Sequence, residues 1–287
     1  MRRARRTEAR RERGALRLTP RDIEVLEATG RMRYVTTPQL ARLLFGGSQW
    51  AARKRLRRLF DAGCLRCWSP RLEAPNVYAL TLRGARLLGH PDPHGEPWPA
   101  PRGLDRRLEH LLAVNSLPVA LATTLESESA VIEWWQSDVE LLRLFRECVV
   151  PDALFRIGWP DISNVFALEV DRTPPAPQAF ARKLLRYQSL RSQAFGAGAF
   201  TLLVVGGKPA WVERARDHAR KLGRSVPVWF GVFEDIDSHG AYGSWRSLHD
   251  NCHPSLRSVA SAERARQAEL PETPSPRAGA QAREPRG

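Results

Sequence analysis

The chain has 287 residues, enough for two modest domains, and its hydrophobic content of 43% is ordinary for a globular protein. The formal net charge of +14 favours a polyanionic partner, although only four of the 45 basic residues are lysines. No run of 18 apolar residues and no apolar segment behind the Arg-rich start are present, so we expect neither a membrane span nor a secretion signal. Four scattered cysteines do not make a disulfide framework, which fits a cytoplasmic protein.

Changes in composition divide the chain into five segments. We expect a flexible basic arm over residues 1–17, a first domain over 18–89, a Pro-rich linker over 90–103, a second domain over 104–253 and a disordered tail over 254–287. A short helix around residues 260–270 is an alternative within the tail.

The first domain begins with three predicted helices. Thr19-Pro20 and Thr37-Pro38 are typical helix starts, and Gly30 ends the first helix. Ser48 caps the third helix and Gly63 ends it.

The third helix has two different faces. Helical spacing places Ala52, Leu56, Leu59 and Phe60 on one side, which predicts a core face. The rest of the helix carries cations and one aromatic residue, as a helix in a DNA major groove requires. The predicted DNA contacts are Gln49, Trp50, Arg53, Lys54, Arg57 and Arg58. The alternative is a solvated amphipathic helix.

A predicted hairpin follows the third helix. Residues 64–68 and 77–82 are typical strands, and the loop between them contains prolines. A short helix then runs from about Arg83 to Leu88. Three helices, a hairpin and a closing helix predict a winged helix-turn-helix whose wing contacts the DNA backbone near Arg71.

The second domain alternates helices with strands, which predicts an α/β sandwich with a mixed sheet. Pro118 should kink or break its first helix. Helices are expected at about 104–125, 139–145, 178–195 and 211–222, and strands at about 131–134, 148–155, 165–171, 200–205 and 226–233.

Acidic residues mark two of these strands, in Pro151-Asp152 and in Glu169-Val170-Asp171. Carboxylates on adjacent strands form an oxygen site suited to Mg²⁺. The order of elements and acids resembles the restriction-endonuclease-like, or PD-(D/E)xK, nuclease superfamily. The resemblance implies that Asp152 and Glu169 hold the metal and that a lysine two residues after the glutamate assists catalysis.

Asp171 stands where that lysine is expected, which is a departure from the superfamily pattern. Lys183 on the following helix is the candidate for a migrated lysine, so the catalytic candidates are Asp152, Glu169 and Lys183. Glu109 is a candidate for an additional acid. The alternative is purely structural, with Asp152 and Glu169 paired to Arg172, Arg182 or Arg186.

Several blocks in a fixed order are similar to the replication-relaxation family. They are Leu18–Asp22, Tyr34–Leu40, Val77–Gly84, His110–Asn115, Pro151–Ala153 and Leu168–Arg172 with Lys183 and Tyr187. The resemblance implies a DNA-binding protein of plasmids or integrated mobile elements, linked to DNA replication and relaxation. It does not imply a catalytic mechanism.

Three functional hypotheses follow from these patterns. The first is a mobile-element protein that binds double-stranded DNA and engages replication or mobilisation proteins, with a homodimer as an alternative assembly. The second is a Mg²⁺-dependent enzyme that nicks or cleaves DNA. The third is a winged-helix transcriptional regulator whose second domain dimerises or senses a ligand.

Overall fold

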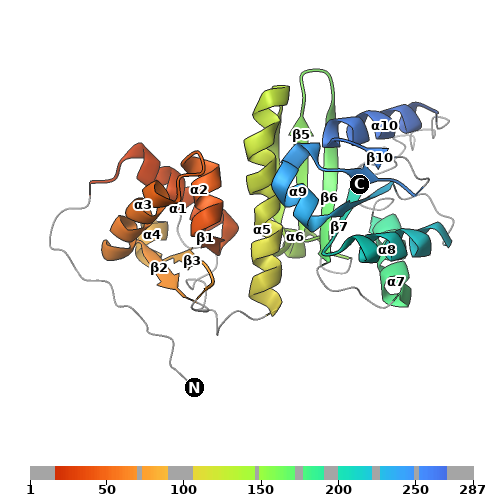
Figure 1. Ribbon diagram of the computed structural model, residues 1–287. Helices are drawn as coiled ribbons and strands as arrows, with labels where there is room; N and C mark the ends of the chain where they lie inside the picture. The colour runs from red at the N-terminus through yellow and green to blue at the C-terminus, as the bar shows by residue number, and fades with distance from the viewer. Residues whose placement is uncertain are drawn as a thin grey trace, which may run out of the picture.

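A computed structural model describes residues 17–69, 73–89, 106–145, 149–171, 177–190, 200–221, 227–248 and 252–269. The elements form two groups that lie side by side (Figure 1). We call residues 17–89 the N-terminal part and residues 106–269 the sheet part. The predicted wing residue Arg71 lies outside the described residues, as do residues 1–16 and the predicted linker.

The N-terminal part contains four helices and a small antiparallel sheet with the strand order β1-β3-β2. Its elements are α1 (Pro20–Met32), β1 (Val35–Thr36), α2 (Thr37–Leu44), α3 (Gln49–Asp61), β2 (Leu65–Trp68), β3 (Val77–Leu80) and α4 (Leu82–Leu87). Capping boxes start α1 and α2, with Thr19 and Asp22 at α1 and with Thr36 and Gln39 at α2. The cap of α2 is therefore one residue earlier than the sequence pattern indicated.

The sheet part contains a seven-stranded mixed sheet with the order β10-β9-β8-β7-β6-β5-β4. Strands β6, β7 and β8 run parallel, and the remaining neighbours are antiparallel. The strands are β4 (Val131–Ser137), β5 (Ala153–Gly158), β6 (Ser163–Asp171), β7 (Thr201–Gly206), β8 (Val228–Val232), β9 (Trp245–Arg246) and β10 (Cys252–His253). The predicted α/β class with a mixed sheet is confirmed.

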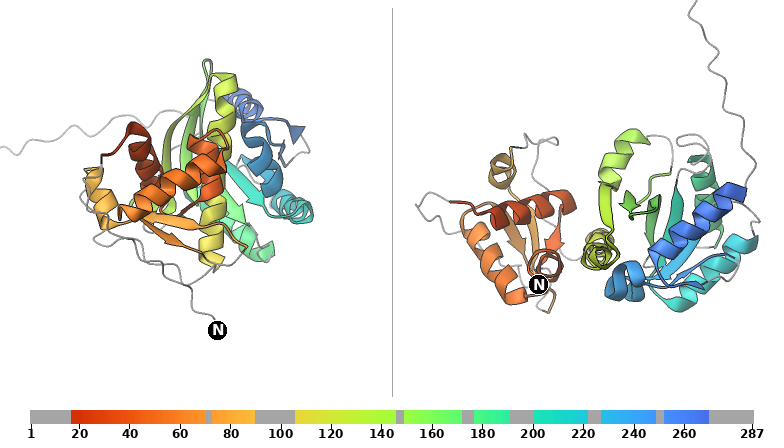
Figure 2. Two further views of the ribbon diagram at one scale, coloured as in Figure 1. Left: turned by 60° about the vertical axis from the view of Figure 1, so that its left-hand side comes forward. Right: turned by 90° about the horizontal axis from the view of Figure 1, so that it is seen from above.

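Helices cover both faces of this sheet. The helices are α5 (Arg106–Leu125), α6 (Asp138–Leu144), α7 (Pro177–Leu190), α8 (Pro209–Lys221), α9 (Phe233–His239) and α10 (Leu256–Glu269), with short 3-10 turns at Glu126–Glu128 and Gly240–Tyr242. One buried cluster joins α5, α9 and α10 to the sheet, and a second joins α6, α7 and α8 to the opposite face (Figures 1 and 2). Leu168 and Val170 of β6 face the first cluster and Ala167 faces the second, because side chains alternate along a strand.

Helix α5 does not break at Pro118. It continues without interruption from Arg106 to Leu125, contrary to the sequence expectation. Proline removes one backbone hydrogen bond, but α5 is packed along its length, and Leu117, Val119 and Leu121 beside the proline are buried. Tertiary packing therefore outweighs the local penalty.

The expectation of a disordered tail from residue 254 is wrong for residues 254–269, which include α10. Leu256, Val259 and Ala260 of α10 are buried in the core. Glu263 accepts a 2.8 Å hydrogen bond from the indole of Trp229. Among the described side chains of α10, only three apolar residues are buried, and the next position on that face is the acid Glu263, so the apolar pattern in the sequence is short.

Helix α5 lies between the N-terminal part and the sheet (Figure 1). Among the described residues, Arg106–Glu128 is the one helical stretch long and apolar enough to cross a membrane by length and composition alone. Half of its apolar window is buried inside the protein, and a core helix passes the same test. Its contacts on both sides account for its apolar composition.

Hydrogen bonds join the two parts across α5. The Gln39 amide donates to the Leu112 carbonyl at 2.8 Å, and the Asn115 amide donates to the carbonyls of Met32 and Tyr34, both at 2.8 Å. Arg42 pairs with Asp237 at 2.9 Å.

Candidate functional site

Helix α3 presents a continuous polar and cationic surface. Ala52, Leu56, Leu59 and Phe60 are buried, as the helical spacing predicts. The residues predicted to contact DNA are all exposed: Gln49, Trp50, Arg53, Lys54, Arg57 and Arg58. We call these six residues the α3 surface.

Contacts within the α3 surface hold several of its side chains in place. Trp50 is 73% exposed, and the Lys54 ammonium lies 5.2 Å from the centre of its ring. Arg53 donates to Gln49 at 3.0 Å, and Arg57 pairs with Asp61 at 2.8 Å. Trp50 therefore lies outside the core, among the cations of the α3 surface.

Arg55 of the same helix turns inward instead. Its guanidinium pairs with the buried Asp22 carboxylate at 3.1 Å and also donates to Thr19. Burial raises the pKa of Asp22, but the bonds from Thr19 and Arg55 outweigh burial and leave that pKa lowered. Arg55 therefore holds α3 against the start of α1.

A second group of functional side chains gathers where β6 ends and β5 begins. The Asp152 amide donates to the Leu168 carbonyl at 2.9 Å, and the Asp152 carboxylate accepts the Val170 amide proton at 2.8 Å. These two bonds fix Asp152 beside Glu169, the residue between Leu168 and Val170. Antiparallel pairing of the two strands thus brings together acids that are 17 residues apart in the sequence.

Helix α7 supplies the partners of Glu169. Lys183 forms an ion pair with one carboxylate oxygen, and the Tyr187 hydroxyl donates to the other. The two residues lie on one face of α7 because they are four positions apart. The sequence-predicted trio of Asp152, Glu169 and Lys183 is therefore brought to one place. Arg182 and Arg186, the alternative partners of Glu169, are exposed on α7, and Arg172 lies outside the described residues.

His110 of α5 completes this group, and the sequence hypotheses gave it no role. Its Nε2 lies 2.9 Å from Asp152 Oδ1. Glu109, the proposed additional acid, precedes His110 by one residue, but the histidine makes the bond to Asp152. The family block that begins at His110 was a signal that could have identified it, as was the block containing Tyr187. We call His110, Asp152, Glu169, Asp171, Lys183 and Tyr187 the carboxylate cluster.

The cluster perturbs the ionisation of its members. Burial and the nearby charge of Asp152 raise the pKa of Glu169 to about 7, against the opposing effect of Lys183 and Tyr187. Burial also raises the pKa of Asp171. The hydrogen bond to Asp152 raises the pKa of His110. Burial is likewise the largest cause that raises the pKa of Tyr187, so this hydroxyl stays protonated and donates to Glu169.

The carboxylates can be tested for their fit to Mg²⁺. Among the described residues, no three His, Cys, Asp or Glu side chains are arranged to hold a metal ion. Mg²⁺ is usually held by one or two carboxylates together with water and substrate phosphate, and Asp152 and Glu169 are two carboxylates that lie side by side. A cation between Asp152 and Glu169 would bind carboxylate oxygens that His110 and Lys183 contact in this structure.

Comparison with known proteins identifies one family. No curated protein and no solved structure matches the chain significantly. The model of the replication-relaxation family matches residues 26–203, which is more than half of the chain and includes both the α3 surface and the carboxylate cluster. The chain therefore belongs to the replication-relaxation family.

Proposed function

We propose that this chain is a DNA-binding protein of a plasmid or integrated mobile element, acting in replication or relaxation of that DNA. Family membership supports the biological setting. The observation that carries the proposal is the α3 surface, where four cations and an exposed tryptophan occupy one side of a helix whose other side is core. The order α1-β1-α2-α3-β2-β3-α4 in the N-terminal part supports assigning it as a winged helix-turn-helix.

In this proposal α3 enters the major groove of duplex DNA. Phosphate contacts from Arg and Lys supply most of the affinity, and a guanidinium can bond a guanine edge in two places. Gln49 at the start of α3 is suited to adenine. Trp50 offers an apolar surface to a thymine methyl group or a sugar.

The first prediction concerns the salt dependence of DNA binding. Arg53→Ala with Lys54→Ala removes two predicted phosphate contacts, so affinity should fall at least about tenfold at low salt. The slope of log K against log salt should become shallower by about 1.8, because each phosphate contact contributes about 0.9. Fluorescence anisotropy with a labelled duplex at several salt concentrations measures both quantities.

Arg214→Ala with Lys221→Ala is the matched control. Both residues are exposed on α8 and carry the same total charge, but they lie outside the α3 surface. If the two double variants weaken binding equally, the effect comes from net charge and the proposal for α3 is wrong.

A second candidate function is metal-dependent DNA nicking, and the convergence of Asp152, Glu169 and Lys183 favours it. Asp152 and Glu169 would hold Mg²⁺, which when bound would stabilise charge on a phosphodiester and make a water more acidic. Lys183 places an ammonium beside Glu169, where it can offset charge that develops on a phosphate.

The second prediction tests this enzyme directly. Supercoiled plasmid incubated with the protein and Mg²⁺ should be nicked, and Asp152→Asn should slow nicking about 100-fold or more. Asp161→Asn, at an exposed acid that pairs with Arg257, is the control and should leave the rate unchanged. Intact plasmid after incubation with a wild-type protein that binds it tightly would exclude the nuclease and leave the DNA-binding proposal standing.

A further inference from the structure

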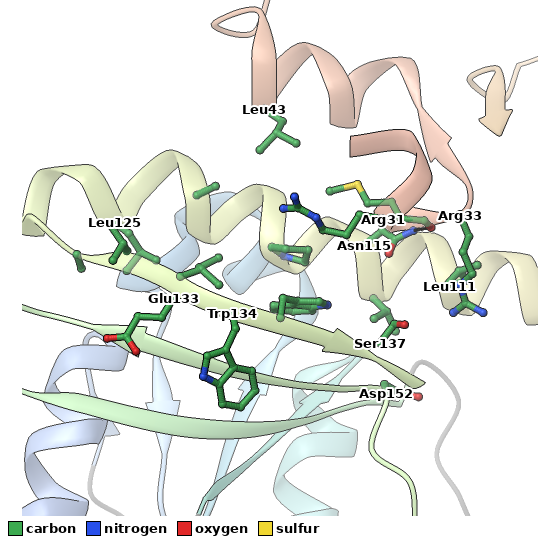
Figure 3. Close-up of a pocket in the computed structure, with 18 of the residues that line it drawn as sticks. Arg31, Arg33, Leu43, Leu111, Asn115, Leu125, Glu133, Trp134, Ser137 and Asp152 are labelled. Carbon is green, nitrogen blue, oxygen red and sulfur yellow. Dashed lines mark hydrogen bonds between the residues drawn. The ribbon is translucent and has the colours of Figure 1, made fainter. Parts of the chain in front are cut away.

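A groove of about 590 Å³ lies between the N-terminal part and the sheet part. It is bounded by the end of α1, by one side of α5 and by strand β4, and its lining includes Asp152 of the carboxylate cluster (Figure 3). Volumes of about 300–1,000 Å³ are typical of sites for small organic ligands. The groove is thus large enough for a nucleotide and opens onto the candidate site.

The walls of the groove are mainly apolar. Helix α5 contributes Leu111, Val114 and Pro118, and β4 contributes Ile132 and Trp135. The Trp135 ring stacks on Phe155, with ring centres 4.6 Å apart and planes 20° apart. Trp135 is half-buried against the core, and the rest of its side chain borders the groove.

Arg31, in the last turn of α1, lines the groove and is exposed. Of the other charged lining residues, Arg33 bonds Asp138 and Glu133 bonds Arg156 at 2.9 Å. Glu126 also lines the groove and is exposed. Glu133 and Trp134 point to the side of β4 away from α5 (Figure 3). The groove therefore combines an aromatic platform of fixed orientation with a cation exposed to solvent.

We propose that this groove binds an unpaired segment of a DNA strand. A base stacks on the part of the Trp135 ring that borders the groove, the Arg31 guanidinium contacts a phosphate, and the strand continues past Asp152. Flat aromatic side chains beside cations bind single strands with little sequence preference. Paired bases in a duplex are stacked on one another and offer no free face to Trp135. This inference rests on the proposal that the protein binds DNA. It assigns single-stranded DNA to the groove and duplex DNA to the α3 surface.

The test compares three labelled DNAs on the full-length protein by fluorescence anisotropy. They are a ten-nucleotide thymidine oligomer, the same backbone with abasic sites, and a hairpin duplex. Trp135→Leu should weaken binding of the thymidine oligomer about tenfold, and Arg31→Ala should weaken it severalfold. Neither change should alter duplex affinity. The abasic oligomer should bind the wild type and Trp135→Leu equally weakly.

Tyr242→Leu is the control, because this tyrosine is an exposed aromatic residue that does not line the groove. It should leave binding of all three DNAs unchanged. Trp135→Phe keeps an aromatic face and should restore most of the affinity. Circular dichroism checks folding, and if Trp135→Leu does not fold, then Arg31→Ala, Trp135→Phe and the abasic oligomer still decide the question.

Several outcomes would overturn the inference. They are no binding of the thymidine oligomer by the wild type, equal binding of the thymidine and abasic oligomers, or equal losses in Tyr242→Leu and Trp135→Leu. Loss of single-strand binding in Arg53→Ala with Lys54→Ala, but not in Trp135→Leu, would assign the strand to α3 instead. If Arg53→Ala with Lys54→Ala leaves the affinity for the duplex unchanged, the proposed role of α3 is wrong. The measurements of single-strand binding in the groove variants would still stand.

Discussion

Glu169 is a buried acid whose carboxylate is held by two polar partners. It is only 4% exposed, yet its two carboxylate oxygens are met by the Lys183 ammonium and the Tyr187 hydroxyl. Without such partners, a buried carboxylate would simply take up a proton. Its pKa of about 7 means that both protonation states are present near neutral pH.

The third prediction follows from this raised pKa. Between pH 4.5, the ordinary pKa of a glutamate, and about 7, the unfolded chain has lost this proton while the folded protein keeps it. The free energy of unfolding should therefore decrease as pH rises through this window, by up to about 3 kcal/mol. The raised pKa of His110 acts in the same direction, since its contribution is lost as pH rises through its folded value.

Urea unfolding at four pH values between 5 and 8 measures this dependence. Glu169→Gln cannot ionise, so its unfolding free energy should vary less across the window. If the wild type and Glu169→Gln have the same pH dependence, Glu169 does not titrate there.

At the scale of elements, the helical spacing of apolar residues indicated which side of a helix is buried. It predicted both faces of α3 correctly, because the four buried apolar residues follow a regular helical spacing. The same signal was weak for α10, whose buried face includes a small alanine side chain.

The fourth prediction tests that α10 belongs to the folded core. Leu256 is completely buried, so Leu256→Ala should lower the free energy of unfolding by about 2–5 kcal/mol. Ser261→Ala, at an exposed position of the same helix, should change it by less than about 0.5 kcal/mol. Equal stability of the two variants would show that α10 does not contribute to the core.

At the scale of the whole molecule, α5 connects the two parts and contributes to the carboxylate cluster and to the groove. His110 and the groove residues lie on the same helix as Asn115, which bonds the end of α1. One helix thus contacts both the N-terminal part and Asp152.

The fifth prediction measures this connection. Asn115 is 7% exposed, and Asn115→Ala leaves the Met32 and Tyr34 carbonyls without their donor. The free energy of unfolding should fall by about 1–3 kcal/mol. Ser127→Ala near the other end of this helical stretch is a control, since its hydroxyl is exposed and the change should be small. A negligible loss in Asn115→Ala would mean that these bonds do not hold the two parts together.

The sequence by itself determined the local features of this protein. Caps, turns and apolar periodicity specified most helices and strands, and the strand pattern indicated a mixed sheet, because these signals act over a few neighbouring residues. The predicted trio of Asp152, Glu169 and Lys183 was brought together as the order of elements suggested.

Only the tertiary structure decided which distant side chains meet. His110 reaches Asp152, Pro118 stays inside an unbroken helix, and Trp135 lines a groove between the two parts. Each of these results depends on how α5 packs between the N-terminal part and the sheet. Contacts of that kind join residues far apart in the chain, and no periodicity along the sequence encodes them.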